Sequence, residues 1–130
     1  MAGSRSETKH GIERIGVRNV TRQTVLADRA GRAVTAEQKN TGLLKHTELE
    51  PGDGLWISGT SAVHTFFMKF PIDLVYLSKD LKVVKTRRAV GPWKLSGAWG
   101  AKSVLELPAG VIEESGTERG DQLIFERQGR

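Results

Sequence analysis

The sequence predicts a single compact β-rich domain of the α+β class, with a barrel-like or sandwich-like antiparallel or mixed sheet. Fifteen glycines in 130 residues favour many turns and short strands over long helices. The run 72–77 is apolar on both faces of an extended chain, which is typical of a strand buried in a sandwich or closed sheet. A chain of this length fits one hydrophobic core. We therefore expect one domain over residues 11–127, flanked by short tails at 1–10 and 128–130.

The first part of the chain predicts one or two strands followed by the main helix. Short β-type runs lie between residues 11 and 27, and Asp28–Gly31 has the composition of a turn. Thr35 and Gln38 have the spacing of a capping box, in which the threonine hydroxyl accepts from the backbone N–H three residues later. We expect the main helix over about 36–46.

The segment 64–77 is the densest apolar run, yet it contains His64, Lys69 and Asp73. Burying an unpaired charge costs several kcal/mol, so each of these side chains needs water, a partner or a ligand. The adjacent Phe66 and Phe67 would point to opposite faces of a strand. Pro71 has no N–H, so we expect a break there. These features predict a cleft near residues 64–73.

The second half of the chain predicts strands over 55–57, 83–90, 103–107 and 122–126. The alternation in 103–107 places Val104 and Glu106 on one face and the two leucines on the other. A short helical turn over about 110–115 should end at Gly116, which suits the left-handed cap position. The segment 97–100 is predicted to be a loop.

The net charge of +5 is uneven along the chain. Between Asp80 and Glu106 there is no acidic residue, and this basic stretch suits a phosphate group or an acidic partner. A solvated strand face explains the same charges. The sequence lacks zinc-finger spacing and aromatic RNA-binding signatures, so a nucleic-acid partner is not expected. The basic residues are Lys82, Lys85, Arg87, Arg88, Lys94 and Lys102.

The sequence indicates the cellular compartment only through features that it lacks. There is no cysteine, which excludes disulfides and thiolate metal sites. No apolar run reaches the roughly 18 residues of a membrane span, and residues 1–10 lack the apolar core of a secretory signal. We expect a cytoplasmic protein without a transmembrane segment, with envelope association left open.

Three side chains are the candidate catalytic groups: His64, Asp73 and Glu106. Imidazole and carboxyl groups are the usual acids and bases of hydrolases. The same three could be imagined around a metal, but no diagnostic ligand spacing is present, so we expect neither a metal nor a cofactor. Each also has a structural reading: a hydrogen-bonding histidine, a turn-capping aspartate, and a glutamate paired with Lys69 or Arg87.

Six residues are the candidate ligand contacts, because they combine loop positions with polar or aromatic side chains. Tryptophans on loop borders favour saccharides, peptides or protein surfaces, and the nearby cations favour an anionic group. A non-catalytic ligand- or protein-binding accessory domain is the first interpretation, and a small hydrolase is the alternative. The six are Ser61, His64, Lys69, Asp73, Trp93 and Trp99.

Four separated segments resemble the bacterial and archaeal DUF192 family, a family of unknown function. The resemblance covers roughly residues 15–126 and implies a compact β-rich α+β domain with no established activity. Where many members have Trp-Met-Lys-Asn-Thr, this chain has Phe-Met-Lys-Phe-Pro at 67–71, which resembles a His-Thr-Phe-x-Met-Lys/Arg-Phe-Pro-Ile-Asp subgroup. The matching segments are 41–44, 64–84, 104–110 and 120–121.

Overall fold

Two strands that are buried along nearly their whole length form the centre of the fold. In the computed structural model, which describes residues 13–35 and 49–127, β5 (Ile72–Leu77) and β8 (Ser103–Pro108) pair antiparallel. Their side chains alternate between two apolar surroundings, so each strand is covered on both faces. This confirms the prediction of a two-sided buried strand.

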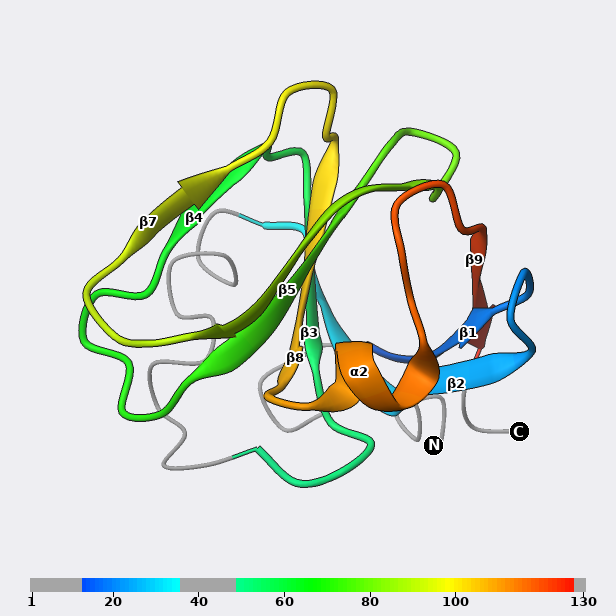
Figure 1. Cartoon of the computed structure of the whole chain (residues 1–130), viewed down its shortest axis with the longest axis horizontal. Coiled ribbons are helices and arrows are strands. Elements are labelled where there is room, and N and C mark those ends of the chain that lie inside the picture. The colour runs from blue at the N-terminus through cyan, green and yellow to red at the C-terminus, as the bar shows by residue number, and fades with distance from the viewer. Residues whose placement is uncertain (1–12, 36–48, 128–130) are drawn as a thin grey trace.

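Five more strands extend this pair into a curled seven-stranded sheet (Figure 1). The order is β6-β5-β8-β3-β2-β1-β9, and β2 with β3 is the parallel pair. The N–H of Val83 donates to the carbonyl of Asp121, and Lys82 bridges to Gln122, which links the two outer strands. The sheet is therefore a half-barrel whose edges meet at one end. The added strands are β1 (Arg14–Asn19), β2 (Thr24–Ala33), β3 (Leu55–Ser58), β6 (Val83–Val90) and β9 (Leu123–Arg127).

A two-stranded ribbon of β4 (Ala62–His64) and β7 (Leu95–Gly97) lies to one side of the half-barrel (Figure 1). Val63 of β4 packs on the core that contains Leu74, Tyr76 and Val104. Ala98, the residue after β7, packs on the same core. The opposite face of the sheet encloses the second core, which includes Ile112 of α2 (Val111–Ser115). The two cores separate the ribbon from α2.

The β-rich fold, the predicted strands and the short C-terminal helix are confirmed. Helix α2 ends at Gly116, which adopts φ 72°, as the sequence predicts for a left-handed cap. The predicted turn at Asp28–Gly31 is wrong, because β2 continues to Ala33. The N–H groups of Asp28 and Arg29 both donate to the carbonyl of Gly52, so the polar pair forms a bulge within a long strand.

The expectation of a strand through Phe66 and Phe67 is also wrong. Strand β4 ends at His64, and the next residues form a turn whose start is fixed by the Met68 N–H donating to the Thr65 carbonyl. Strand β7 was not predicted, since Leu95–Gly97 is too short and too polar to show a period of two. The predicted helix over 36–46, the tails and the family-like segment 41–44 lie outside the described residues.

Candidate functional site

Thr65 joins the two loops at the end of the ribbon. It is 1% exposed, and its hydroxyl donates to the Gly91 carbonyl at 2.7 Å and accepts from the Lys94 N–H at 2.9 Å. Its N–H donates to the Lys94 carbonyl, and its own carbonyl accepts from Trp93. A single buried residue therefore fixes the loop after β4 against the loop before β7.

This junction presents four rings at the surface, which we call the aromatic patch: His64, Phe66, Phe67 and Trp93. Phe66 stacks on Trp93 with ring centroids 5.7 Å apart, and Phe67 meets the same indole edge to face at 4.7 Å. His64 lies 4.8 Å from Phe66, and its Nδ1 accepts from the Phe66 N–H. The rings thus form one continuous cluster.

The two rings at the outer side of the patch are unusually exposed and have unusual backbones. Phe67 is 63% exposed and Trp93 is 60% exposed. Their φ values are 67° and 64°, in the left-handed region that bulky residues rarely adopt. Such strain costs of order 1–3 kcal/mol per residue and concentrates at functional sites. The fold therefore maintains two aromatic side chains in water at a cost in free energy.

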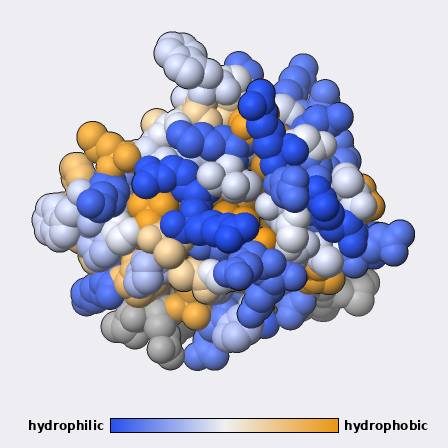
Figure 2. All heavy atoms as spheres, in the orientation of Figure 1, coloured by the Kyte–Doolittle hydropathy of each residue, from blue (hydrophilic) through white to orange (hydrophobic). Residues whose placement is uncertain are grey.

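Lys69 and Lys94 are exposed beside the patch, and Leu95 adds an apolar side chain that is 72% exposed. Within the described residues, neither lysine has a carboxylate within ion-pairing distance. Figure 2 shows strongly hydrophilic side chains crowded over the middle of the face, with apolar groups between them and toward the ribbon. The surface near the ribbon is thus both apolar and basic.

Asp73 is placed elsewhere, on the inner face of the half-barrel. It is fully buried, and its Oδ2 accepts from the N–H groups of Gly110 and Ile112 at 3.1 and 2.9 Å. Its Oδ1 accepts from Ala89 at 2.8 Å. All three donors are backbone groups, so Asp73 ties the start of α2 to β6 and is not open to a ligand from solvent.

Glu106 is on the neighbouring strand and faces the other way. Leu107 pairs with Asp73 across the ladder, while Glu106 pairs with Leu74, so the two carboxyl groups lie on opposite faces of the sheet. Burial raises the pKa of Glu106 to about 8. Within residues 13–35 and 49–127 the Glu106 carboxyl has no ion pair. The expected ion pair with Lys69 or Arg87 is therefore not formed.

Ser61 and Trp99 lie at the end of the ribbon that is farther from the aromatic patch. In the ribbon register His64 pairs with Leu95, whereas Ala62 pairs with Gly97. The Ser61 carbonyl accepts from the Ala98 N–H at 3.0 Å. Trp99 follows directly and is 101% exposed. The structure therefore places these two predicted ligand contacts at the opposite end of the ribbon from His64.

The structure does not bring His64, Lys69 and Asp73 together at the cleft predicted near residues 64–73. The third candidate catalytic group, Glu106, is also apart from them. His64 and Lys69 are exposed at the loop end, Asp73 is buried inside the half-barrel, and Glu106 is buried on the sheet's other face. In the described part of the chain, no three His, Asp or Glu side chains are grouped as metal ligands. Acid-base catalysis by His64 with either carboxyl lacks the proximity that it requires.

Sequence reasoning missed Thr65 and Phe67 as site residues. Threonine between two rings gives no pattern of its own, because its role depends on carbonyl and N–H groups 26 and 29 residues away. The number of phenylalanines in this segment could have identified Phe67. Phenylalanines at 66, 67 and 70 are more than one face of a strand can bury, so at least one of them was to be expected at the surface.

Asp121 is a further buried acid, in the Gly-Asp element of the family resemblance. Its Oδ2 accepts from Asn19 Nδ2 at 3.0 Å, Arg22 Nε at 3.0 Å and the Glu118 N–H at 2.9 Å. Burial alone would raise the pKa of Asp121, but these hydrogen bonds outweigh it and hold the pKa below its ordinary value. The element joins β1 to the turn before β9.

Comparison with solved structures supports the fold. A protein of unknown function from Novosphingobium aromaticivorans superposes with a TM-score of 0.75 at 19% identity, covering 95% of this chain and 98% of that one. A "putative transcription regulator" from Sinorhizobium meliloti superposes with a TM-score of 0.77 at 20% identity, covering 92% and 97%. At these identities the likeness concerns the fold alone.

Comparison with sequences identifies the family. A UPF0127 protein of Thermococcus sibiricus is 37% identical over 67 residues, 51% of this chain and 43% of that protein. A UPF0127 protein of Pyrococcus furiosus is 34% identical over 68 residues, 52% of this chain and 58% of that protein. The chain thus spans about half the length of these relatives. No helix in the described ranges is long and apolar enough to cross a bilayer. The DUF192 family model, described as "Uncharacterized ACR", matches residues 17–125, and the chain therefore belongs to the DUF192 family, a family of unknown function.

Proposed function

We propose that the domain is a non-catalytic binding domain, which holds an acidic segment of a partner polypeptide against the aromatic patch. The observation that carries the proposal is the pair formed by Phe67 and Trp93. Both rings are more than half exposed, both have a left-handed backbone, and both are fixed through Thr65. A contiguous exposed apolar surface that the fold maintains against strain is typical of an interaction site.

The residue types favour a polypeptide partner. Tryptophan and other aromatic side chains dominate binding energy at protein interfaces, and they do so when a rim excludes water around them. Leu95 extends the apolar surface beside the rings. An aliphatic neighbour of this kind suits the side chains of a peptide better than the hydroxyl groups of a saccharide.

The charges favour acidic groups on that partner. The four patch residues lie within two longer chain segments, 54–72 and 81–105, and neither segment contains an aspartate or a glutamate. Lys69 and Lys94 flank the rings and are exposed. Complementary charge at the rim of an interface speeds encounter and selects against basic partners.

The test is selection of peptides from a phage-displayed random library on the folded domain. We expect enrichment of peptides that combine Asp or Glu with apolar residues. Fluorescence polarisation should then give at least a tenfold weaker Kd for Trp93→Ala, the loss of one buried interface anchor. Trp99→Ala is the matched control, since it removes the same side chain at the other end of the ribbon. Far-UV circular dichroism and the unfolding midpoint verify that both variants fold.

Two outcomes would overturn the proposal. One is a selected pool with no more acidic residues than the input library. The other is equal loss of binding in the two tryptophan variants, which would place the contact away from the patch. A glycan array that shows saccharide binding lost in Trp93→Ala would replace the polypeptide with a sugar as the ligand.

A further inference from the structure

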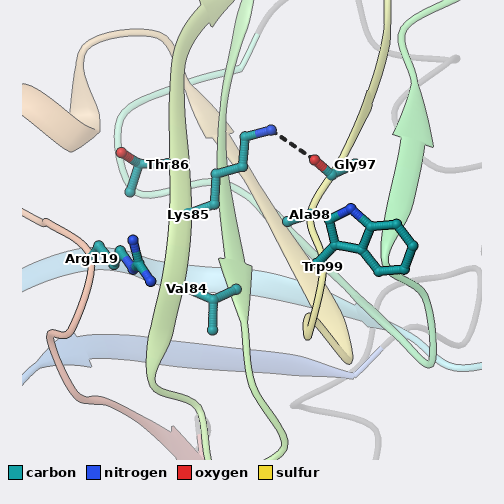
Figure 3. Close-up of a pocket in the computed structure, with 7 residues that line it drawn as sticks. All are labelled: Val84, Lys85, Thr86, Gly97, Ala98, Trp99 and Arg119. Atoms are coloured by element: carbon teal, nitrogen blue, oxygen red, sulfur yellow. Dashed lines mark hydrogen bonds between the residues drawn. The ribbon is translucent and has the colours of Figure 1, made fainter.

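A separate surface cavity of about 460 Å³, widely open to solvent, lies at the other end of the ribbon (Figure 3). It lies between the first half of β6, the loop after β7 and the turn before β9. This volume is within the range of small-molecule sites. Figure 3 shows Lys85 extending toward Gly97, with Trp99 beyond it and Arg119 approaching from the other side of β6. The lining includes Val84, Lys85, Thr86, Ala98, Trp99 and Arg119.

Two cations line this cavity, one from each side of β6, and neither has a counter-charge among the described residues. Lys85 Nζ donates to the Gly97 carbonyl at 2.7 Å and lies 5.8 Å from the centroid of the Tyr76 ring. These contacts hold the ammonium group at the cavity wall. In residues 13–35 and 49–127, no carboxylate pairs with Lys85 or with Arg119, and the adjacent Glu118 is already paired with Arg22 at 3.2 Å. An anion is the charge that this site lacks.

The cavity also has a flat apolar wall and a hydroxyl group. Trp99 is the most exposed large hydrophobic side chain in the described structure, so its indole is available to stack on a ring. Val84 and Ala98 pack on the core beneath and give the cavity a rigid floor. Thr86 supplies a hydroxyl group from the other face of β6, the side from which Arg119 approaches. The site therefore combines anion recognition with ring recognition.

We infer that this cavity binds a small phosphate ester that carries a ring, of the nucleoside monophosphate or sugar phosphate class. Lys85 and Arg119 contact the phosphate oxygens, and the ring stacks on Trp99. A planar guanidinium and a point-charge ammonium are the usual pair for a phosphate group. The site is independent of the aromatic patch, because the β4–β7 ribbon separates them.

The experiment is a titration of the folded domain followed through the tryptophan indole N–H signals in ¹H–¹⁵N spectra. The chain has three tryptophans, so Trp99→Phe assigns the reporting signal. The probes are AMP, glucose 6-phosphate, adenosine and inorganic phosphate. We expect the Trp99 signal to shift with at least one of the two esters. Adenosine and inorganic phosphate should bind at least tenfold more weakly than that ester.

Matched charge variants locate the phosphate. Arg119→Gln and Lys85→Gln should each weaken ester binding about tenfold, as expected for loss of one charge-assisted contact. Arg88→Gln removes the same charge from an exposed position of β6 outside the cavity, and should change the Kd by less than twofold. AMP binding without glucose 6-phosphate binding assigns the nucleoside source, and the converse assigns the sugar source.

Three results would overturn the inference. They are no Trp99 shift with either ester, equal affinity for inorganic phosphate and the esters, and equal weakening by Arg88→Gln and Arg119→Gln. Absence of a Trp99 shift would mean that the cavity does not bind these esters. Equal affinity for inorganic phosphate would mean that the indole contributes nothing, and equal weakening by the two arginine variants would mean that only net charge matters. Among residues 13–35 and 49–127 no ion pair is formed by Arg119, so its variant tests the site even if Lys85→Gln is destabilised.

Discussion

The Thr65 hydroxyl lies 2.7 Å from the Gly91 carbonyl oxygen, and this one hydrogen bond spans the two loops that present the aromatic patch. The same hydroxyl accepts from the Lys94 N–H, so one buried oxygen serves both directions. Because the side chain is buried, water cannot replace it. The placement of Trp93 therefore depends on a residue that is not itself at the surface.

We expect Thr65→Val to destabilise the domain by about 2 kcal/mol, since it leaves the part-buried Gly91 carbonyl and Lys94 N–H without their partner. Urea unfolding measures this loss. Thr65→Ser keeps the hydroxyl and should retain most of the stability. Both variants can also be made in a Trp99→Phe background and followed by tryptophan fluorescence. The emission should change more in Thr65→Val than in Thr65→Ser, because the valine variant releases the loop that carries Trp93. Equal stability of the valine and serine variants would contradict the bridging role.

The role of Asp73 gives a second prediction. Its carboxylate accepts three backbone N–H groups from α2 and β6. We expect Asp73→Asn to cost about 3 kcal/mol, because the amide NH₂ faces donors and leaves buried N–H groups unpaired. Chemical denaturation with Asp80→Asn, an exposed aspartate, as control measures the difference. A folded, equally stable Asn variant would show that the three bonds are dispensable.

These residues also indicate what sequence could and could not predict. The apolarity of 72–77 on both faces predicted a central strand, because burial on two sides is written in the strand itself. Gly116 predicted the end of α2, since only the local backbone decides a left-handed cap. Local signals therefore recovered most of the sheet.

The candidate site depended on register, which sequence alone did not give. Asp73 and Glu106 were both candidate catalytic groups, but pairing of Asp73 with Leu107 puts their side chains on opposite faces of the sheet. A shift of one residue in the register would have reversed this. The bulge at Asp28 and Arg29 had the composition of a turn, and only the carbonyl of Gly52, a long-range partner, keeps the strand going. The predictions that failed were those that required distant partners.

Glu106 predicts a pH dependence of stability. Burial raises its pKa to about 8 from an ordinary value of 4.5. Below the ordinary value both states carry the proton, and burial of the carboxyl imposes no ionisation cost. Between the two values the unfolded chain releases the proton while the folded chain retains it, so stability falls as pH rises and the loss is complete above the folded pKa.

We therefore expect Glu106→Gln, which is neutral at every pH, to be more stable than the wild type at about pH 9 by on the order of 4 kcal/mol. At about pH 4 the two should be similar. Unfolding midpoints across this range measure the difference, and Glu50→Gln, at an exposed position, should follow the wild type. A difference between wild type and Glu106→Gln that does not grow with pH would contradict a buried proton at this site.

The lysines beside the aromatic patch give the last prediction. Lys69 and Lys94 are exposed and flank rings that we propose contact an acidic peptide. Reversing both charges, Lys69→Glu with Lys94→Glu, should weaken binding of a selected acidic peptide by about tenfold or more and slow its association. Added salt should reduce wild-type affinity, because exposed charges are screened within about 10 Å at 0.1 M. Lys79→Glu changes one exposed lysine in the turn between β5 and β6 and should have a small effect. Surface plasmon resonance separates the two rates. If Lys79→Glu raised the free energy of binding by half as much as the double variant, the effect per reversed charge would be equal. Net charge alone would then govern binding, and the aromatic patch would have no selective rim.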